Sequence, residues 1–275
     1  MEKITFMTKQ IKYVPVLKWK TAEMTALKHI SSEHKKSIAP LIEIVLPTVN
    51  PYKDKERKIK KTDEEIHTEM VEKMVTKRIF KIPEEIEKSW GAGKIYIDVT
   101  LLHNKDKTND LKIFALNTLV IESSIKKLKI IPVINIADDS LLVSNVKDLI
   151  SKKVVDELCL RITSSNLKDL DILNNKISSL LNFLKTVKQK VHLLVDLKYL
   201  DPLSGNYDVL FSSAQKIRDL SQFSEFIFAD GAFPVDMSEC PFEEPTYLPR
   251  RDWISWKNNT AKKDLDRVPV YSDYS

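Results

Sequence analysis

The stretch Leu193-Leu-Val-Asp196 is a short apolar run that ends in a carboxylate. The same pattern occurs at Pro40-Leu-Ile-Glu43, Ile95-Tyr-Ile-Asp98 and Pro132-Val-Ile-Asn135. Each run is apolar on both faces, which is typical of parallel strands that are covered by helices. The repeat therefore predicts a parallel sheet whose strands end in polar side chains at the same level.

Short apolar runs of this kind alternate with amphipathic segments along the whole chain. The predicted strands are Val14–Lys18, Leu41–Val45, Ile95–Val99, Ile131–Ile136, Leu158–Thr163, Leu193–Leu197, Phe226–Asp230 and Val268–Asp273. Between them, apolar residues recur at helical spacing, most clearly from Leu170 to Val187. Thr62 and Glu65 have the spacing of a capping box, and Pro83 is typical of the first turn of a further helix. Strict alternation predicts a single (β/α)8 barrel of the TIM type over residues 1–275, with an open doubly wound sheet as the alternative.

The end of the chain bears on how such a barrel is completed. A full barrel has a helix after its last strand, and this helix covers the first and last strands. The sequence stops at Ser275, two residues after the predicted last strand. We therefore expect either that the last helix belongs to a segment absent from this sequence, or that another chain covers the flank of the eighth strand.

The composition is that of an ordinary globular protein. Hydrophobic residues make up 43% of the chain and charged residues 30%, which is enough apolar content for a large core. No signal peptide or transmembrane run is visible, and the two cysteines are too few for a disulfide framework. These features predict a cytoplasmic protein without membrane contact. The net charge of +5 is typical of a lysine-rich surface.

Polar residues end every predicted strand at nearly the same offset. They are Lys18, Lys20, Glu43, Asp98, Asn135, Arg161, Asp196, Lys198, Asp230 and Asp273. Because alternate residues of a barrel strand point inward, we expect this set to converge at the C-terminal mouth, where barrel enzymes keep their sites. Crowded carboxylates repel one another unless cations offset them, so an internally paired ionic network is the alternative to a functional site.

Carboxylates without histidines beside them are typical of a site for a hard divalent ion such as Mg²⁺ or Mn²⁺. The expected metal ligands are Glu43, Asp98, Asp196 and Asp230. Arg161 and the lysines would then hold a phosphate or carboxylate, because a guanidinium can bind such groups through two hydrogen bonds. The candidate catalytic residues are Lys18, Lys20, Asp98, Arg161, Lys198 and Asp273.

Two segments beside the expected mouth carry their own signal. Residues 53–61 are rich in lysine and arginine, which favours either a solvated surface or contact with an anionic substrate such as a nucleotide or nucleic acid. Residues 231–252 form a long loop with aromatic side chains that either stack on a base or pack on the barrel rim. The expected substrate-binding residues are Asn135, Arg57, Lys58, Arg250 and Arg251.

Several stretches resemble one known family. They are Tyr13-Val-Pro-Val-Leu-Lys-Trp-Lys20, Ala26-Leu27, Ala39-Pro-Leu-Ile-Glu-Ile44, Arg251-Asp-Trp253, Trp256 and Ser272-Asp-Tyr274. They are similar to motifs of the beta family protein group of phages and bacterial mobile elements, and the resemblance covers nearly the whole chain. It implies that Lys18, Lys20, Glu43 and Asp273 belong to a shared site. It also implies a role in phage–host conflict, but it implies no reaction. Similar proteins continue beyond the position of Ser275.

Three hypotheses about function follow. The first is a metal-dependent enzyme, a phosphoester hydrolase or nuclease, that acts on a phosphorylated or nucleic-acid substrate at the mouth in phage defence. The second is a non-catalytic binding or sensor module of a multi-protein defence complex, which engages its partner at the mouth or at the flank of the eighth strand. The third, a barrel that handles a small carboxylated metabolite, explains the polar ring but not the basic segment.

Overall fold

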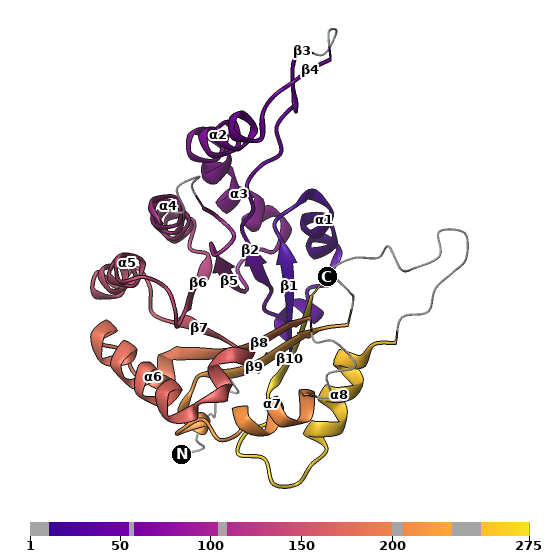
Figure 1. The fold of residues 1–275 in the computed structure, drawn as a ribbon, viewed down its shortest axis with the longest axis vertical. Coiled ribbons are helices and arrows are strands. Elements are labelled where there is room, and N and C mark those ends of the chain that lie inside the picture. The colour runs from indigo at the N-terminus through magenta and orange to yellow at the C-terminus, as the bar shows by residue number, and fades with distance from the viewer. Residues whose placement is uncertain (1–10, 55–57, 104–108, 200–205, 233–248, 275) are drawn as a thin grey trace, which may run out of the picture.

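The computed structural model describes residues 11–54, 58–103, 109–199, 206–232 and 249–274, which form a closed barrel of parallel strands with helices around it (Figure 1). The barrel strands are β1 (Tyr13–Lys18), β2 (Leu41–Glu43), β5 (Lys94–Asp98), β6 (Lys129–Asn135), β7 (Leu158–Thr163), β8 (Val191–Tyr199), β9 (Glu225–Gly231) and β10 (Val270–Tyr274). They close in the order β1-β10-β9-β8-β7-β6-β5-β2. This confirms the predicted (β/α)8 barrel, because the pairing of β1 with both β2 and β10 excludes an open sheet.

Helices connect the strands and cover the outside of the barrel (Figure 1). They are α1 (Thr21–His29), α2 (Asp63–Lys73), α3 (Ile79–Ser89), α4 (Asp110–Ile125), α5 (Ser140–Ser151), α6 (Leu170–Leu184), α7 (Tyr207–Ala214) and α8 (Arg251–Thr260). The apolar stripe of α6 is buried, as its spacing predicts, with Leu173, Ile177 and Leu184 almost fully covered. Within the described ranges, no helix combines the length and the apolar content needed to cross a membrane.

The start of α2 confirms the predicted capping box. The hydroxyl of Thr62 accepts a hydrogen bond from the backbone N–H of Glu65 at 3.2 Å, and the Glu65 carboxylate accepts one from the N–H of Thr62 at 2.9 Å. The expectation that Pro83 opens a separate helix is wrong, because a π-helical turn at Met74–Arg78 joins α2 to α3 and Pro83 lies inside α3. Burial of Ile82, Pro83 and Ile86 on one face of α3 offsets the hydrogen bond that a proline cannot donate.

Side chains along each strand alternate between the barrel interior and the helix layer. The interior holds an apolar cluster that includes Val14, Tyr96, Leu194, Ile227 and Val270. The residues between them, such as those at positions 193, 195, 226 and 228, belong to a larger cluster shared with the helices. This alternation decides which polar residues can reach the mouth.

A two-stranded hairpin projects from the barrel between β2 and α2 (Figure 1). It is formed by β3 (Tyr52–Asp54) and β4 (Ile59–Lys60), which pair antiparallel. The hairpin carries part of the basic segment, and its strands make no pair with the barrel. The basic residues are therefore held away from the barrel strands themselves.

Candidate functional site

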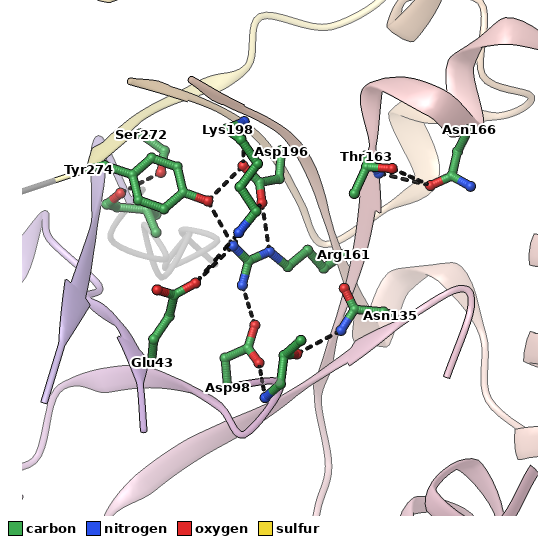
Figure 2. A network of polar contacts seen from close by, with 12 residues as sticks. Glu43, Asp98, Asn135, Arg161, Thr163, Asn166, Asp196, Lys198, Ser272 and Tyr274 are labelled. Carbon is green, nitrogen blue, oxygen red and sulfur yellow. Dashed lines mark hydrogen bonds and ion pairs between the residues drawn. The ribbon is translucent and has the colours of Figure 1, made fainter. Parts of the chain in front are cut away.

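Inward-facing side chains from five strands meet inside the C-terminal mouth of the barrel. We call this set the mouth ring, and Figure 2 shows its members: Glu43 of β2, Asp98 of β5, Arg161 of β7, Asp196 of β8 and Tyr274 of β10. Each member continues the inward alternation of its own strand, two residues after an interior apolar or small residue. The sequence pattern therefore correctly predicted that polar residues from separate strands converge here.

The guanidinium of Arg161 lies among the carboxylates and contacts all of them. Its Nε donates to Asp196 at 2.9 Å, its Nη2 donates to Glu43 at 3.0 Å, and its Nη1 donates to Asp98. Nη2 also donates to the Tyr274 hydroxyl at 2.7 Å, and that hydroxyl donates to Asp196 at 2.7 Å. Such charge-assisted hydrogen bonds are the strongest that side chains make.

Arg161 and Asp196 of the mouth ring keep their charges although they are almost closed to water. Arg161 is 2% exposed, and Asp98 and Asp196 are each 1% exposed. Burial opposes the charge of Arg161, but the surrounding carboxylates outweigh it and raise the pKa of the guanidinium. Burial also opposes the charge of Asp196, but Arg161 and Lys198 outweigh it and lower the pKa of that carboxyl. Each charge is thus tolerated because its partners are present.

Lys198 is the cation on the solvent side of the mouth ring. Its side chain is 53% exposed, and its Nζ lies 3.2 Å from Asp196 and 3.7 Å from Glu43. The same Nζ lies 5.3 Å from the centre of the Tyr274 ring. The backbone φ of Lys198 is +58°, where β8 slips out of register with β9. A left-handed backbone is costly for a residue with a side chain and is often found at functional positions.

Asn135, Lys18 and Lys20 lie near the mouth without contacting Arg161. The amide of Asn135 donates to the Thr100 hydroxyl at 2.8 Å, and the N–H of Thr100 donates to Asp98 at 2.7 Å, so Asn135 is linked to the ring indirectly. Lys18 ends β1 and Lys20 precedes α1, and both side chains are exposed. Neither lysine has an ion pair with the ring within the described chain.

Asp230 and Asp273 do not join the mouth ring, which corrects the expected convergence. In β9 the inward positions are Ile227 and Ala229, so Asp230 points to the helix layer, and its carboxylate accepts the N–H of Gly231 at 2.8 Å. In β10 the inward positions are 270, 272 and 274, so Asp273 points outward as well. The inward-facing positions of these two strands were assigned one residue too early or too late, and a shift of one residue moves a side chain to the opposite face of a strand.

The basic segment is partly neutralised by α2. An ion pair of 2.6 Å joins Lys53 to Glu65, and Lys61 pairs with a second acidic residue of the same helix. Lys58 is exposed, and Arg57 lies outside the described residues. Surface pairs of this kind contribute little to stability, and they reduce the positive charge that a bound anion would meet.

The mouth ring does not fit a divalent ion. The position between its carboxylates, where Mg²⁺ or Mn²⁺ would bind, is taken by the guanidinium of Arg161. Asp230, the fourth expected ligand, faces the helix layer. Across the described part of the chain, no three His, Cys, Asp or Glu side chains are arranged to hold a metal ion. A metal bound here would have to displace a cation that all three carboxylates already contact.

Tyr274 is the member of the ring that sequence reasoning missed. It lies beyond the apolar run of the last strand, so the end of that run pointed to Asp273 instead. The sequence feature that indicates it is the two-residue spacing from Val270 through Ser272 to Tyr274, because every second residue of this strand points into the barrel. Burial and the nearby Asp196 raise the pKa of the Tyr274 hydroxyl, so it stays a proton donor at neutral pH.

A cavity of about 500 Å³ lies on the outer flank of the barrel, where the first strand β1 pairs with the last strand β10 beneath α8. We call it the seam pocket; it is lined by Lys12, Tyr13, Arg250, Trp253, Trp256, Tyr271 and Asp273. Asp273 and Arg250, both predicted as site residues, thus meet here rather than at the mouth. The neighbouring Arg251 begins α8 and is exposed. The expectation of a missing helix after the last strand concerns chain beyond β10 and stays a prediction.

The polar side of the seam pocket is held by Arg250. This guanidinium donates to both oxygens of Asp252, at 3.1 and 2.9 Å, and also to Asp273. The Tyr271 hydroxyl donates to Asp252 at 2.6 Å and lies 3.2 Å from a carboxylate oxygen of Asp273, and the Tyr13 hydroxyl donates to Asp273. Burial and these carboxylates raise the pKa of both tyrosines. The acidic oxygens of the pocket are therefore already hydrogen-bonded.

Aromatic rings form the other side of the seam pocket. Trp253 and Trp256 stack with their ring centres 5.3 Å apart and an angle of 14° between the planes. Tyr271 meets both indoles edge-on, at 4.9 and 5.5 Å. The indole N–H of Trp256 is buried and has no hydrogen-bond partner among the described residues, which costs about 1–3 kcal/mol for a polar group of this kind. Trp253 remains 42% exposed, so its indole face is open to solvent beside the pocket.

A family model described as Beta protein matches residues 13–275. The chain belongs to the Beta protein family. The match covers the mouth ring and all of the seam pocket except Lys12, and it confirms the resemblance to this phage-associated group that the opening and closing motifs indicate. Neither the curated proteins nor the solved structures contain a match to the chain.

The motif residues of this Beta protein family member thus lie in two different sites. Glu43 and Tyr274 belong to the mouth ring, whereas Tyr13, Trp253 and Asp273 belong to or line the seam pocket. The mouth ring is internally paired, and the seam pocket is open and aromatic. The shared site implied for Lys18, Lys20, Glu43 and Asp273 is therefore divided in space.

Proposed function

We propose that this phage-associated barrel is a non-catalytic binding module, whose mouth ring is a structural ionic clamp and whose binding surface is the seam pocket. The observation that carries the proposal is the engagement of Arg161 with Glu43, Asp98 and Asp196 at once. A carboxylate that acts as a metal ligand or general base needs a free lone pair directed at the substrate. Here the three carboxylates are directed at a buried cation that belongs to the protein.

Thermal unfolding with and without Mg²⁺ or Mn²⁺ tests this proposal. A metal that binds only the folded protein raises the unfolding midpoint by mass action. We expect the same midpoint with and without millimolar metal in the wild type, and a lower midpoint in Asp98→Asn. A metal-dependent rise in the wild type that disappears in Asp98→Asn would contradict the proposal and make the mouth a metal site.

Lys198 favours a second candidate, an enzyme that acts on a phosphorylated or nucleic-acid substrate at the mouth. Its ammonium is half exposed above the ring, and its backbone is held in a left-handed conformation. Exposed cations attract phosphate groups, and local strain is a mark of functional positions. A screen of phosphomonoesters and oligonucleotides with wild-type and Lys198→Met protein tests this candidate. It requires that the wild type turns over at least one substrate and that the variant loses this turnover.

Both candidates share a proposed setting in phage–host conflict, which rests on the family to which the chain belongs. Plaque counts on bacteria that express the protein test this setting. A binding module with the seam pocket as its surface would lose its effect on plaque number in Trp253→Ala and keep it in Lys198→Met. An enzyme at the mouth would give the opposite pattern, and equal plaque counts with and without the wild-type protein would refute a defence role.

A further inference from the structure

We propose that the seam pocket binds a nucleotide, that is, a flat aromatic base that carries a phosphate. This inference rests on the proposed function, in which the seam pocket is the binding surface, and it names the ligand of that surface. It follows from three features of the pocket: the hydrogen-bonding groups left unused, the local charge and the aromatic wall.

The unused hydrogen-bonding groups in and beside the pocket are all donors. Asp273 and Asp252 already accept hydrogen bonds from Arg250 and from tyrosine hydroxyls on both of their oxygens. Three groups are left without a partner in the described chain: the ammonium of Lys12, the Nη1 of Arg250 and the buried indole N–H of Trp256. The indole N–H is closed to solvent, so a ligand meets the Lys12 ammonium and the Arg250 Nη1; it must supply acceptors, and a phosphate supplies the most per atom.

The charged group left unpaired also favours an anion. Aromatic walls beside acidic side chains could instead form a cage for a quaternary ammonium group. In the seam pocket, however, Arg250 lies against Asp252 and Asp273 and offsets one of their two charges, and every oxygen of the two carboxylates already accepts a hydrogen bond. Lys12 adds an exposed positive charge at the edge of the same pocket. A cationic ligand would find these carboxylates already hydrogen-bonded, whereas a phosphate would pair with the Lys12 ammonium, which has no ion pair in the described chain.

The aromatic wall fits the base. Trp253 and Trp256 stack nearly parallel on α8, and Trp253 remains 42% exposed. Stacking of a base on an aromatic side chain needs only a flat ring and tolerates any base. The volume of about 500 Å³ lies in the range of small-ligand sites, roughly 300–1,000 Å³, so a mononucleotide fits this pocket better than a long strand.

Calorimetric titration with four nucleoside monophosphates, adenosine and inorganic phosphate tests the proposal. We expect at least one monophosphate to bind the wild type, and adenosine and phosphate each to bind at least tenfold more weakly, a difference of about 1.4 kcal/mol or more. Trp253→Ala should weaken the monophosphate at least tenfold. Lys12→Gln should weaken the monophosphate and leave adenosine unchanged, because Lys12 is assigned to the phosphate alone.

The matched control is Lys257→Ala, an exposed residue of α8 that does not line the pocket. It should bind as the wild type does, and an equal loss in this variant would overturn the assignment to the seam pocket. Absence of binding for all four monophosphates, or equal binding by Trp253→Ala, would also overturn it. These failures are distinct from that of the proposed function, which fails on a metal-dependent midpoint whatever the nucleotides do.

Discussion

Replacing Arg161 with Met removes the cation of the mouth ring and leaves its carboxylates buried. Arg161 is 2% exposed, and Glu43, Asp98 and Asp196 are between 1% and 4% exposed, so water cannot replace the guanidinium. Loss of one partner from a buried ion pair costs about 3–5 kcal/mol. Protonation of one carboxylate limits the cost, so we expect a loss of about 4 kcal/mol at pH 7.

The loss is measured by thermal unfolding followed by circular dichroism. For a domain of this size, 1 kcal/mol shifts the midpoint by about 2–4 °C, so the midpoint of Arg161→Met should fall by roughly 10 °C. The control is Arg78→Met, because Arg78 pairs with Glu85 at 2.6 Å but both side chains are at least 20% exposed. That pair should contribute about 1 kcal/mol or less, as expected for a partly solvated ion pair.

The pH dependence has a definite sign. The pKa of Asp196 is lower in the folded protein than its ordinary value of 3.8, so its stabilising effect is present above that value and is lost as the pH falls below it. The difference in unfolding midpoint between wild type and Arg161→Met should therefore become smaller below pH 4. If Arg161→Met does not fold, Asp98→Asn provides a milder version of the same test. A midpoint for Arg161→Met within 3 °C of Arg78→Met at pH 7 would refute the clamp.

Two further predictions concern other parts of the fold. Burial raises the pKa of Glu225, so the charged carboxylate destabilises the folded protein at neutral pH. In urea unfolding, Glu225→Gln should therefore be more stable than the wild type at pH 7, and this gain should disappear below pH 4. A variant that is less stable than the wild type at pH 7 would contradict this. Thr62→Ala removes the capping box of α2 and should cost about 1 kcal/mol in the same assay, whereas the exposed mid-helix Thr68→Ala should cost less. Equal losses in the two threonine variants would show that the cap is not what stabilises this helix.

The barrel could be predicted from sequence because its signal is repeated in every βα unit. A parallel strand covered by helices is apolar on both faces, so each run is visible by itself, and strict alternation with helices leaves few topologies. The convergence of Glu43, Asp98, Arg161 and Asp196 followed from their equal offsets at the ends of four strands. These features depend only on local pattern and on the symmetry of the fold.

The phase of β9 and β10 could not be derived from the end of the apolar run. Asp230 and Asp273 follow their runs as Asp196 follows its own, but they occupy outward positions. Side-chain size held a clue, since the bulky Phe226 and Phe228 face the helix layer and the small Ala229 faces the interior. Which residues of a strand point inward is decided by the position of the neighbouring strands. This position depends on contacts between distant parts of the chain.

The pairing inside the mouth ring was also beyond the sequence. Opposite charges at strand ends are compatible with a metal site and with an ionic network, and the choice depends on whether the long side chain of Arg161 folds inward. The seam pocket posed a similar difficulty. It brings Tyr13 together with Arg250 and Tyr271, which lie more than two hundred residues further along the chain.

Strand β10 pairs with β1 across nearly the whole chain; the hydroxyl of Ser272 donates to the carbonyl of Val14, a separation of 258 residues. Such a contact carries a large loop-closure cost and forms slowly. We therefore expect the ring of strands to close last during folding. The Tyr274 hydroxyl arrives on the same strand, so its bonds to Arg161 and Asp196 form only when closure is complete. Until then, nascent chains expose the β1 edge, and a circular permutant that joins the two strands by a short linker would make the slowest step local.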